Sequence, residues 1–138
     1  MRLEHINLVV NDLDRTLNFY KAAFPHWRVR VSGKAEWYGK KRNWCHFGDD
    51  YTYLSFNDDG EGENRNLHGH TPGLAHFAYE TQDLDSLIAR MEQANYPPRT
   101  FSSENSWRKN AYFIDPDGNE VEFIEYLSDL PELRNNND

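Results

Sequence analysis

The sequence lacks the features that mark several large classes of protein. Its single cysteine, Cys45, cannot form an internal disulfide, and no apolar run approaches the roughly 20 residues of a membrane helix. The first ten residues, "MRLEHINLVV", carry Glu4 and His5 where a signal peptide would be apolar. We therefore expect a cytoplasmic protein with no membrane partner, and an inert, buried thiol at Cys45 in the strand-like "NWCHF".

Basic residues are also scarce. The 15 Lys and Arg residues face 23 Asp and Glu residues, which gives a net charge of −8, and no basic cluster interrupts the acidity. Nucleic-acid binding depends on cationic patches, so we expect no nucleic-acid partner. The 138 residues are 38% hydrophobic and 14% aromatic, enough for the core of one globular domain. A small molecule is the partner that this composition favours.

An internal repeat divides the chain. The segment "HINLVVNDLD", which begins at His5, nearly recurs as "HFAYETQDLD" from His76, an offset of 76 − 5 = 71 residues. The same offset relates Asp12 to Asp83, so the repeat contains no gap. A unit of roughly 70 residues alone would bury only about 60% of its unfolded surface, and two such modules are therefore expected to share one core.

Each copy predicts a strand, a helix and three more strands. Asp12 and Asp83 are good N-cap residues, and apolar residues recur at helical spacing after both. The expected strands span residues 3–10, 26–32, 43–48 and 51–57 in the first copy, and 74–80, 98–102, 110–115 and 120–126 in the second. The "DPDG" at 115–118 predicts a tight hairpin turn.

These elements predict the α+β class, with two βαβββ modules that form one curved, mainly antiparallel sheet arrangement. We expect a single domain over residues 1–126, made of module one (1–57), a polar linker (58–72) and module two (73–126). A C-terminal tail over 127–138 follows, and we expect it to be frayed after Leu133.

The last strand of each module carries one polar residue between two apolar residues, Glu122 in "VEF" and Ser55 in "LSF". Side chains alternate along a strand, so apolar neighbours packed under the helices turn Glu122 and Ser55 to the opposite face. His5 and His76 are expected on that same face.

Two imidazoles and one carboxylate are a common ligand set for a divalent metal. His5, His76 and Glu122 therefore predict a site for one ion of Fe, Mn, Zn or Ni, with open positions for substrate oxygens. Each residue alone would be read as a hydrogen-bonded strand histidine or an exposed strand carboxylate. Their combination on one face favours the metal site.

At these residues the sequence resembles the vicinal oxygen chelate superfamily, which holds glyoxalase I, extradiol dioxygenases, fosfomycin-resistance thiol transferases and bleomycin-resistance proteins. The similar segments are "HINLVVNDLDRTLNFY", "HFAYETQDLDSLI" and "YFIDPDGNEVEFIE". The resemblance implies a glyoxalase-like fold and places His5, His76 and Glu122 on ligand positions. The fourth ligand position, a glutamate in glyoxalase I, is Ser55 here, which argues against that activity.

The resemblance also implies a metal-dependent enzyme of lyase, dioxygenase or thiol-transferase type, which binds a small substrate through vicinal oxygens. Tyr112 matches a substrate-contacting tyrosine of the fosfomycin transferases. Four polar side chains are expected to line the cavity: Asn7, Tyr53, Ser55 and Tyr112. We expect the loops at 33–43 and 101–110 to set specificity. Many members form dimers, so a homodimer is a further expected partner.

The alternative is a non-catalytic binding module of the bleomycin-resistance type. The charge of −8, four Trp and eight Tyr would suit a cationic ligand, but those binders lack the metal ligands that this chain keeps. Three further residues are given no role in ligand binding. His46 is expected to be a structural strand residue, and the charged pair Arg108 and Lys109 is expected to be solvated rather than to grip an anionic substrate.

Overall fold

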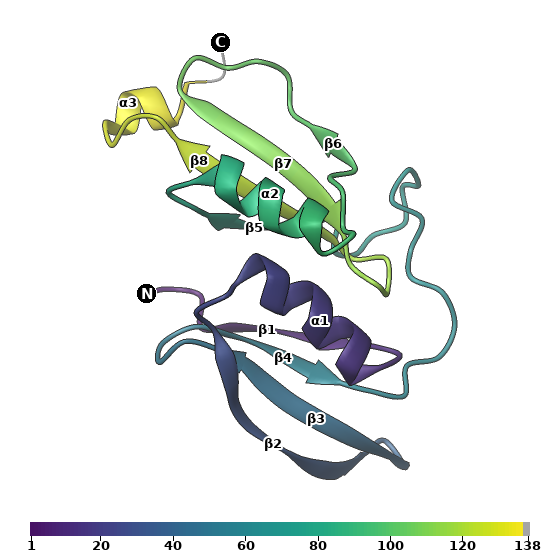
Figure 1. The fold of residues 1–138 in the computed structure, drawn as a ribbon. Coiled ribbons are helices and arrows are strands. Elements are labelled where there is room, and N and C mark those ends of the chain that lie inside the picture. Colours follow the sequence, from purple (N-terminus) through teal and green to yellow (C-terminus); the bar gives the residue numbers. More distant parts are fainter. Residues whose placement is uncertain (137–138) are drawn as a thin grey trace. The chain divides into compact units, whose positions relative to one another are not determined.

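The same order of elements occurs twice along the chain, as the repeat predicts. The structure is a computed structural model that describes residues 1–136. It divides into two compact units, Met1–Glu63 and Asn64–Asp138, and each holds a βαβββ module with its own four-stranded sheet (Figure 1). The α+β class and the two modules are confirmed.

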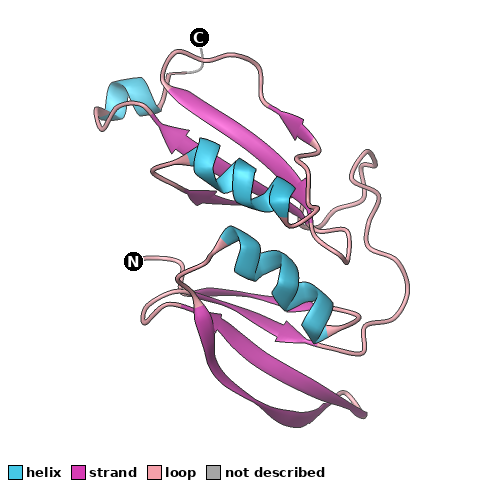
Figure 2. Cartoon of the chain, viewed as in Figure 1, coloured by secondary structure: helices cyan, strands magenta, loops and turns pink. Residues whose placement is uncertain are grey.

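The first unit begins with strand β1 (His5–Val9) and helix α1 (Leu13–Ala23), followed by β2 (Arg28–Trp37), β3 (Lys40–Gly48) and β4 (Tyr53–Asn57). Its strand order is β1-β4-β3-β2, in which the β1–β4 pair is parallel and the other two pairs are antiparallel. Figure 2 shows the helix along one side of this sheet. The buried apolar residues of this unit include Leu8, Phe19, Phe47, Leu54 and Phe56.

Helix α1 starts where the sequence predicts it. The Asp12 side chain accepts a hydrogen bond of 2.8 Å from the backbone amide of Arg15, which satisfies one of the free amides of the first turn. Phe19, Tyr20 and Ala23 are buried on one side of the helix. Pro25 follows the C-cap residue and cannot continue the helical hydrogen bonding.

The structure corrects the predicted loop at 33–43. Strands β2 and β3 run through this segment and meet at a two-residue turn, Tyr38-Gly39, where both residues have positive φ (50° and 79°). Such turns match the twist of a hairpin. The first half of β2 lies in the predicted strand 26–32, but residues 33–37 bury no apolar face, so no apolar alternation marks this outer half in the sequence. A Cβ atom on Gly33 would lie 3.0 Å from the Trp44 ring, which explains the glycine there.

The second unit contains β5 (Phe77–Glu80), α2 (Leu84–Gln93), β6 (Thr100–Phe101), β7 (Arg108–Ile114), β8 (Glu120–Tyr126) and α3 (Pro131–Arg134). Its sheet has the equivalent order, β5-β8-β7-β6, again with a single parallel pair, β5–β8. Asp83 caps α2 through a 2.9 Å hydrogen bond from Ser86, as predicted. The buried apolar residues include Phe77, Leu87, Met91, Phe113 and Phe123.

Helix α3 was not predicted. The Arg134 guanidinium lies 3.7 Å from the centroid of the Tyr126 ring and forms an ion pair of 2.6 Å with Glu80. These contacts hold the segment through Arg134, so the predicted fraying directly after Leu133 is wrong for that residue. Residues 137–138, which share that prediction, lie outside the described part of the chain.

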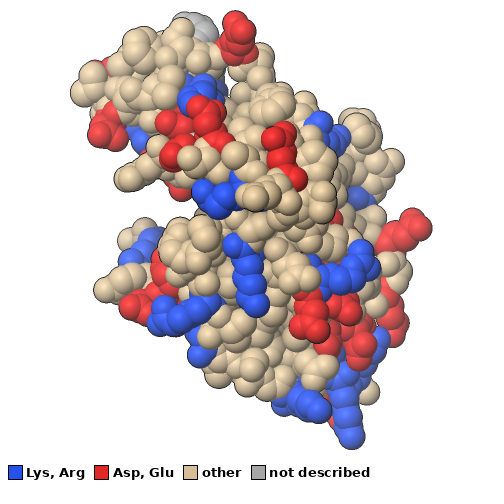
Figure 3. All heavy atoms as spheres, in the orientation of Figure 1, with Lys and Arg blue, Asp and Glu red and all other residues tan. Residues whose placement is uncertain are grey.

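The surface carries charges of both signs. Lys and Arg side chains are interspersed with Asp and Glu over the face seen in Figure 3. Over residues 1–136, no helix combines the length and the apolar character that crossing a bilayer requires.

Candidate functional site

The register of the second sheet places polar residues on one face. Glu122 on β8 lies opposite Tyr112 on β7 and opposite Ala78 on β5. Its neighbours Val121 and Phe123 point to the other face and are buried. The alternation predicted for this strand is therefore observed.

Glu122 is a buried carboxylate, with 5% of its surface exposed. One carboxylate oxygen, Oε1, accepts a hydrogen bond from the Asn110 side-chain amide. The other, Oε2, lies 3.2 Å from Nε2 of His76. Burial, and next a hydrogen bond to Glu122, raises the pKa of Tyr112 to about 12, so this phenol stays protonated.

His76 directly precedes β5, and 42% of its side chain is exposed. Its ring meets the Tyr112 ring edge-on, with 5.8 Å between the centroids and an interplanar angle of 84°. The structure thus brings together three residues singled out in the sequence, His76, Tyr112 and Glu122. Sequence reasoning missed Asn110, although its position two residues before Tyr112 on one strand places both on the same face.

A cavity of about 230 Å³ lies beside this group. Asn110, Tyr112 and Glu122 form part of its wall, and the segment 102–105 forms another part. The Ser102 hydroxyl donates a 3.1 Å hydrogen bond to Oδ1 of Asn110. The loop is therefore linked through Asn110 to the Glu122 carboxylate.

The first unit carries a row of rings on the equivalent face. The rings of His5 and Tyr53 stack with centroids 4.7 Å apart and planes 12° apart. His46 stacks on Tyr53 at 4.5 Å, and the Arg30 guanidinium lies 4.7 Å from the Tyr53 centroid. Burial, and next the nearby His5 and Arg30, holds the pKa of His46 below the ordinary histidine value. His46 therefore belongs to this polar face and favours the neutral form.

The other candidates of the first unit lie beside this row. Asn7 pairs in register with Ser55, and His5 pairs with Tyr53. The Asn7 side-chain oxygen accepts a 2.8 Å hydrogen bond from Asn57, and Ser55 is 6% exposed. Nδ1 of His5 lies 2.8 Å from the Glu4 carboxylate, so its Nε2 is the nitrogen left for another partner.

The geometry at Glu122 fits a metal ligand pair. Two adjacent ligands bound to one ion at about 2.0–2.2 Å are roughly 2.8–3.6 Å apart in octahedral or tetrahedral geometry. The His76–Glu122 separation of 3.2 Å lies in this range, and it also suits a direct hydrogen bond. Within either unit, residues 1–136 hold no group of three His, Cys, Asp or Glu side chains that could bind a metal. His5 belongs to the other unit, so its share in the site stays a prediction.

Similarity to known proteins agrees with this fold. A family model described as "Glyoxalase/Bleomycin resistance protein/Dioxygenase superfamily" matches residues 2–123. A glyoxalase family protein from Enterococcus faecalis has a TM-score of 0.73 at 19% identity, over 90% of this chain and 97% of that chain. The trypanothione-dependent glyoxalase I of Leishmania major has a TM-score of 0.65 at 25% identity, over 91% and 86%.

A third similar structure contains a metal. The fosfomycin resistance protein FosX of Listeria monocytogenes, in complex with Mn(II) and 1S,2S-dihydroxypropylphosphonic acid, has a TM-score of 0.71 at 18% identity. The match covers 95% of each chain. At this identity the likeness concerns the fold, whereas the family model spans nearly the whole sequence. The chain belongs to the Glyoxalase/Bleomycin resistance protein/Dioxygenase superfamily.

Proposed function

We propose that the protein is a metal-dependent enzyme in which His5, His76 and Glu122 hold one divalent ion. The observation that carries this proposal is the buried Glu122 carboxylate with the His76 imidazole 3.2 Å away. A buried carboxylate is costly without a compensating charge, and a divalent cation between these two side chains would supply it. The Mn(II) in the FosX complex supports a divalent metal, here Fe, Mn, Zn or Ni.

The protein residues around the ion would fix its ligands and the substrate. Asn110 donates a hydrogen bond to the Glu122 carboxylate and so restricts its orientation. Tyr112 lies opposite Glu122 on the neighbouring strand. When bound, the metal would act as a Lewis acid toward a small substrate that chelates it through neighbouring oxygens. The polar tips of Asn7, Tyr53 and Ser55 would orient that substrate. The reaction is of lyase, dioxygenase or thiol-transferase type.

The same proposal concerns the organisation of the chain. The proposed ligand set would take His5 from one unit and His76 and Glu122 from the other, so we propose that residues 1–126 act as one domain whose modules are joined by the linker 58–72. The protein would work as a monomer or as a homodimer, because either arrangement can supply one His5 for each His76–Glu122 pair.

Elemental analysis of the purified protein tests this function. We expect one divalent ion for each chain after supplementation with Fe, Mn, Zn and Ni. His5→Ala, His76→Ala and Glu122→Gln should each lose most of the metal while circular dichroism stays unchanged. His70→Ala is the matched control, because His70 is an exposed residue with no assigned site. Equal metal in His76→Ala and wild type, or none in wild type, would contradict the proposal and favour a non-catalytic binding module.

A further inference from the structure

Residues 64–74, which overlap the end of the predicted linker, form a closed loop of the second unit. The Arg65 guanidinium donates hydrogen bonds to three backbone carbonyls of this loop, those of Gly69 (2.9 Å), Thr71 (3.0 Å) and Leu74 (3.4 Å). These bonds tie the two ends of the loop together. Arginine keeps its charge at every ordinary pH, so the closure does not depend on pH. We call residues 64–74 the strap.

Side chains at the start and in the middle of the strap attach it to the rest of the second unit. At the start, the Asn64 amide donates a 2.8 Å hydrogen bond to Oδ1 of Asn119, in the turn between β7 and β8. In the middle, Nε2 of His68 lies 3.2 Å from Nη2 of Arg99, the residue before β6. Arg99 also pairs with the carboxylate of Glu120, the first residue of β8. The middle of the strap is therefore docked through one histidine.

The contact with Arg99 requires one protonation state of the His68 ring. A guanidinium has N–H donors and no acceptor, so Arg99 can only donate this hydrogen bond. Nε2 of His68 must therefore offer a lone pair, which leaves the ring proton on Nδ1 and the imidazole neutral. A protonated imidazole donates from both nitrogens and would place an N–H group against a guanidinium N–H group. The observed arrangement thus belongs to neutral His68 alone.

The charged groups around His68 give no compensation for a second positive charge. Arg99 stays charged, and the Glu120 carboxylate, which is 11% exposed, is already paired with it. The other charged or titratable side chains of the strap are Arg65 and His70, and neither adds a negative charge. The nearest group to a protonated His68 is therefore a cation. Because His68 is exposed, its ring can move away from Arg99 into water.

We propose that His68 is a pH-sensitive switch that docks the strap. The neutral ring accepts the hydrogen bond from Arg99 and holds the middle of the strap in place. When Nε2 takes up a proton, that bond is lost and the middle of the strap undocks, while Arg65 keeps the loop closed and Asn64 keeps it attached. This device goes beyond the proposed function and involves none of the proposed metal ligands, so each proposal can fail without the other.

Relaxation measurements by nuclear magnetic resonance on the ¹⁵N-labelled full chain test the switch. Metal is first removed with EDTA, so that the result does not depend on the metal site. Histidine is the side chain that ordinarily changes charge between about pH 8 and about pH 5, and spectra are recorded at both values. For wild type, we expect backbone order parameters of residues 66–71 of about 0.85 at the higher pH and below about 0.6 at the lower pH.

Two variants separate the hydrogen bond from the titration. His68→Gln should keep the strap ordered at both pH values, because its side-chain oxygen can accept from Arg99 and does not titrate. His68→Ala should leave residues 66–71 mobile at both pH values. His70→Gln is the matched control, because His70 is another exposed histidine of the strap, and it should respond to pH as wild type does.

Circular dichroism should show the same fold for all variants at both pH values. The proposal is overturned if residues 66–71 of wild type are equally ordered at both pH values, or if His68→Gln loses order in acid as wild type does. It is also overturned if His68→Ala is as ordered as wild type at the higher pH, or if His70→Gln abolishes the response.

Discussion

The Nε2 atom of His76 lies 3.2 Å from Oε2 of Glu122, a carboxylate that is almost entirely buried. Glu122 lies on β8, and His76 is the residue before β5. Strands β5 and β8 form the parallel pair of the second sheet. The pairing of β5 with β8, which begins at Phe77 and Val121, therefore brings the backbones of these two residues close together.

Metal binding should weaken in acid. A histidine must be neutral to coordinate a metal, so protons compete with the metal for the imidazole nitrogens and affinity is expected to fall as the pH drops. Competition with a chromogenic chelator between pH 8 and pH 5 would measure this loss. Affinity that is constant over this interval would show that the ion is held without histidine.

Ser55→Glu should tighten metal binding if Ser55 occupies a vacant ligand position. The added carboxylate would be nearly buried, since Ser55 is 6% exposed, and without metal it should lower the melting temperature. Added metal should restore that temperature by binding the folded state. Ser106→Glu, at an exposed serine, is the control and should show neither effect. A Ser55→Glu variant with unchanged metal affinity and an intact fold would remove Ser55 from the site.

Asn110→Ala should weaken metal binding about 10- to 100-fold, because Asn110 is the side chain that orients Oε1 of Glu122. Ser102→Ala should have a smaller effect, since it removes only the hydrogen bond to Asn110. Chelator competition on both variants would establish this order. An equal loss in the two variants would mean that the loop, rather than the amide of Asn110, holds the carboxylate.

The Cys45 thiol should be inert in the folded protein. Burial raises its pKa from 9.0 to about 11, so the reactive thiolate is almost absent at pH 8. A thiol reagent such as Ellman's reagent should react only after unfolding. The unfolded thiol ionises near pH 9 and the folded thiol does not, so the free energy of unfolding should fall as the pH rises from 9.0 to about 11. Rapid labelling of the native protein would contradict this burial.

The periodicity of apolar residues in the sequence is sufficient to predict the helices and strands that bury one face. Strand β8 has the predicted bounds, and Asp12 and Asp83 cap the two main helices as expected. The outer half of the β2–β3 hairpin could not be found in this way, because it buries neither face and carries polar residues on both.

The candidate site, too, could be predicted only in part from the alternation of residues along its strands. Alternation places Glu122 on the polar face, but the role of Asn110 depends on a side-chain hydrogen bond that spacing does not encode. The contact of Arg30 with Tyr53 depends on a register shift between Val29 and Val31, a bulge that adds one residue to the strand. Local sequence does not specify such shifts, whereas packing in the folded sheet does.

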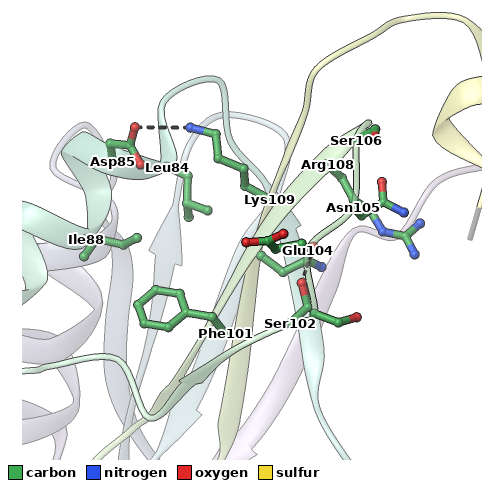
Figure 4. Close-up of a pocket in the computed structure, with 12 residues that line it drawn as sticks. Leu84, Asp85, Ile88, Phe101, Ser102, Glu104, Asn105, Ser106, Arg108 and Lys109 are labelled. Carbon is green, nitrogen blue, oxygen red and sulfur yellow. Dashed lines mark hydrogen bonds and ion pairs between the residues drawn. The ribbon is translucent and has the colours of Figure 1, made fainter. Parts of the chain in front are cut away.

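Ser102 lines the cavity of about 230 Å³ beside Glu122 and also a larger cavity of about 620 Å³ between α2 and the segment 101–106 (Figure 4). Its hydroxyl donates a hydrogen bond to Asn110, which in turn donates one to Glu122. A molecule in the larger cavity that displaces Ser102 therefore changes the hydrogen bonding of the proposed metal ligand. Thermodynamic linkage makes this effect mutual. The factor by which such a molecule changes the affinity for the metal equals the factor by which the metal changes the affinity for that molecule. If the metal binds at Glu122 as proposed, Ser102 would therefore couple occupancy of the larger cavity to metal affinity.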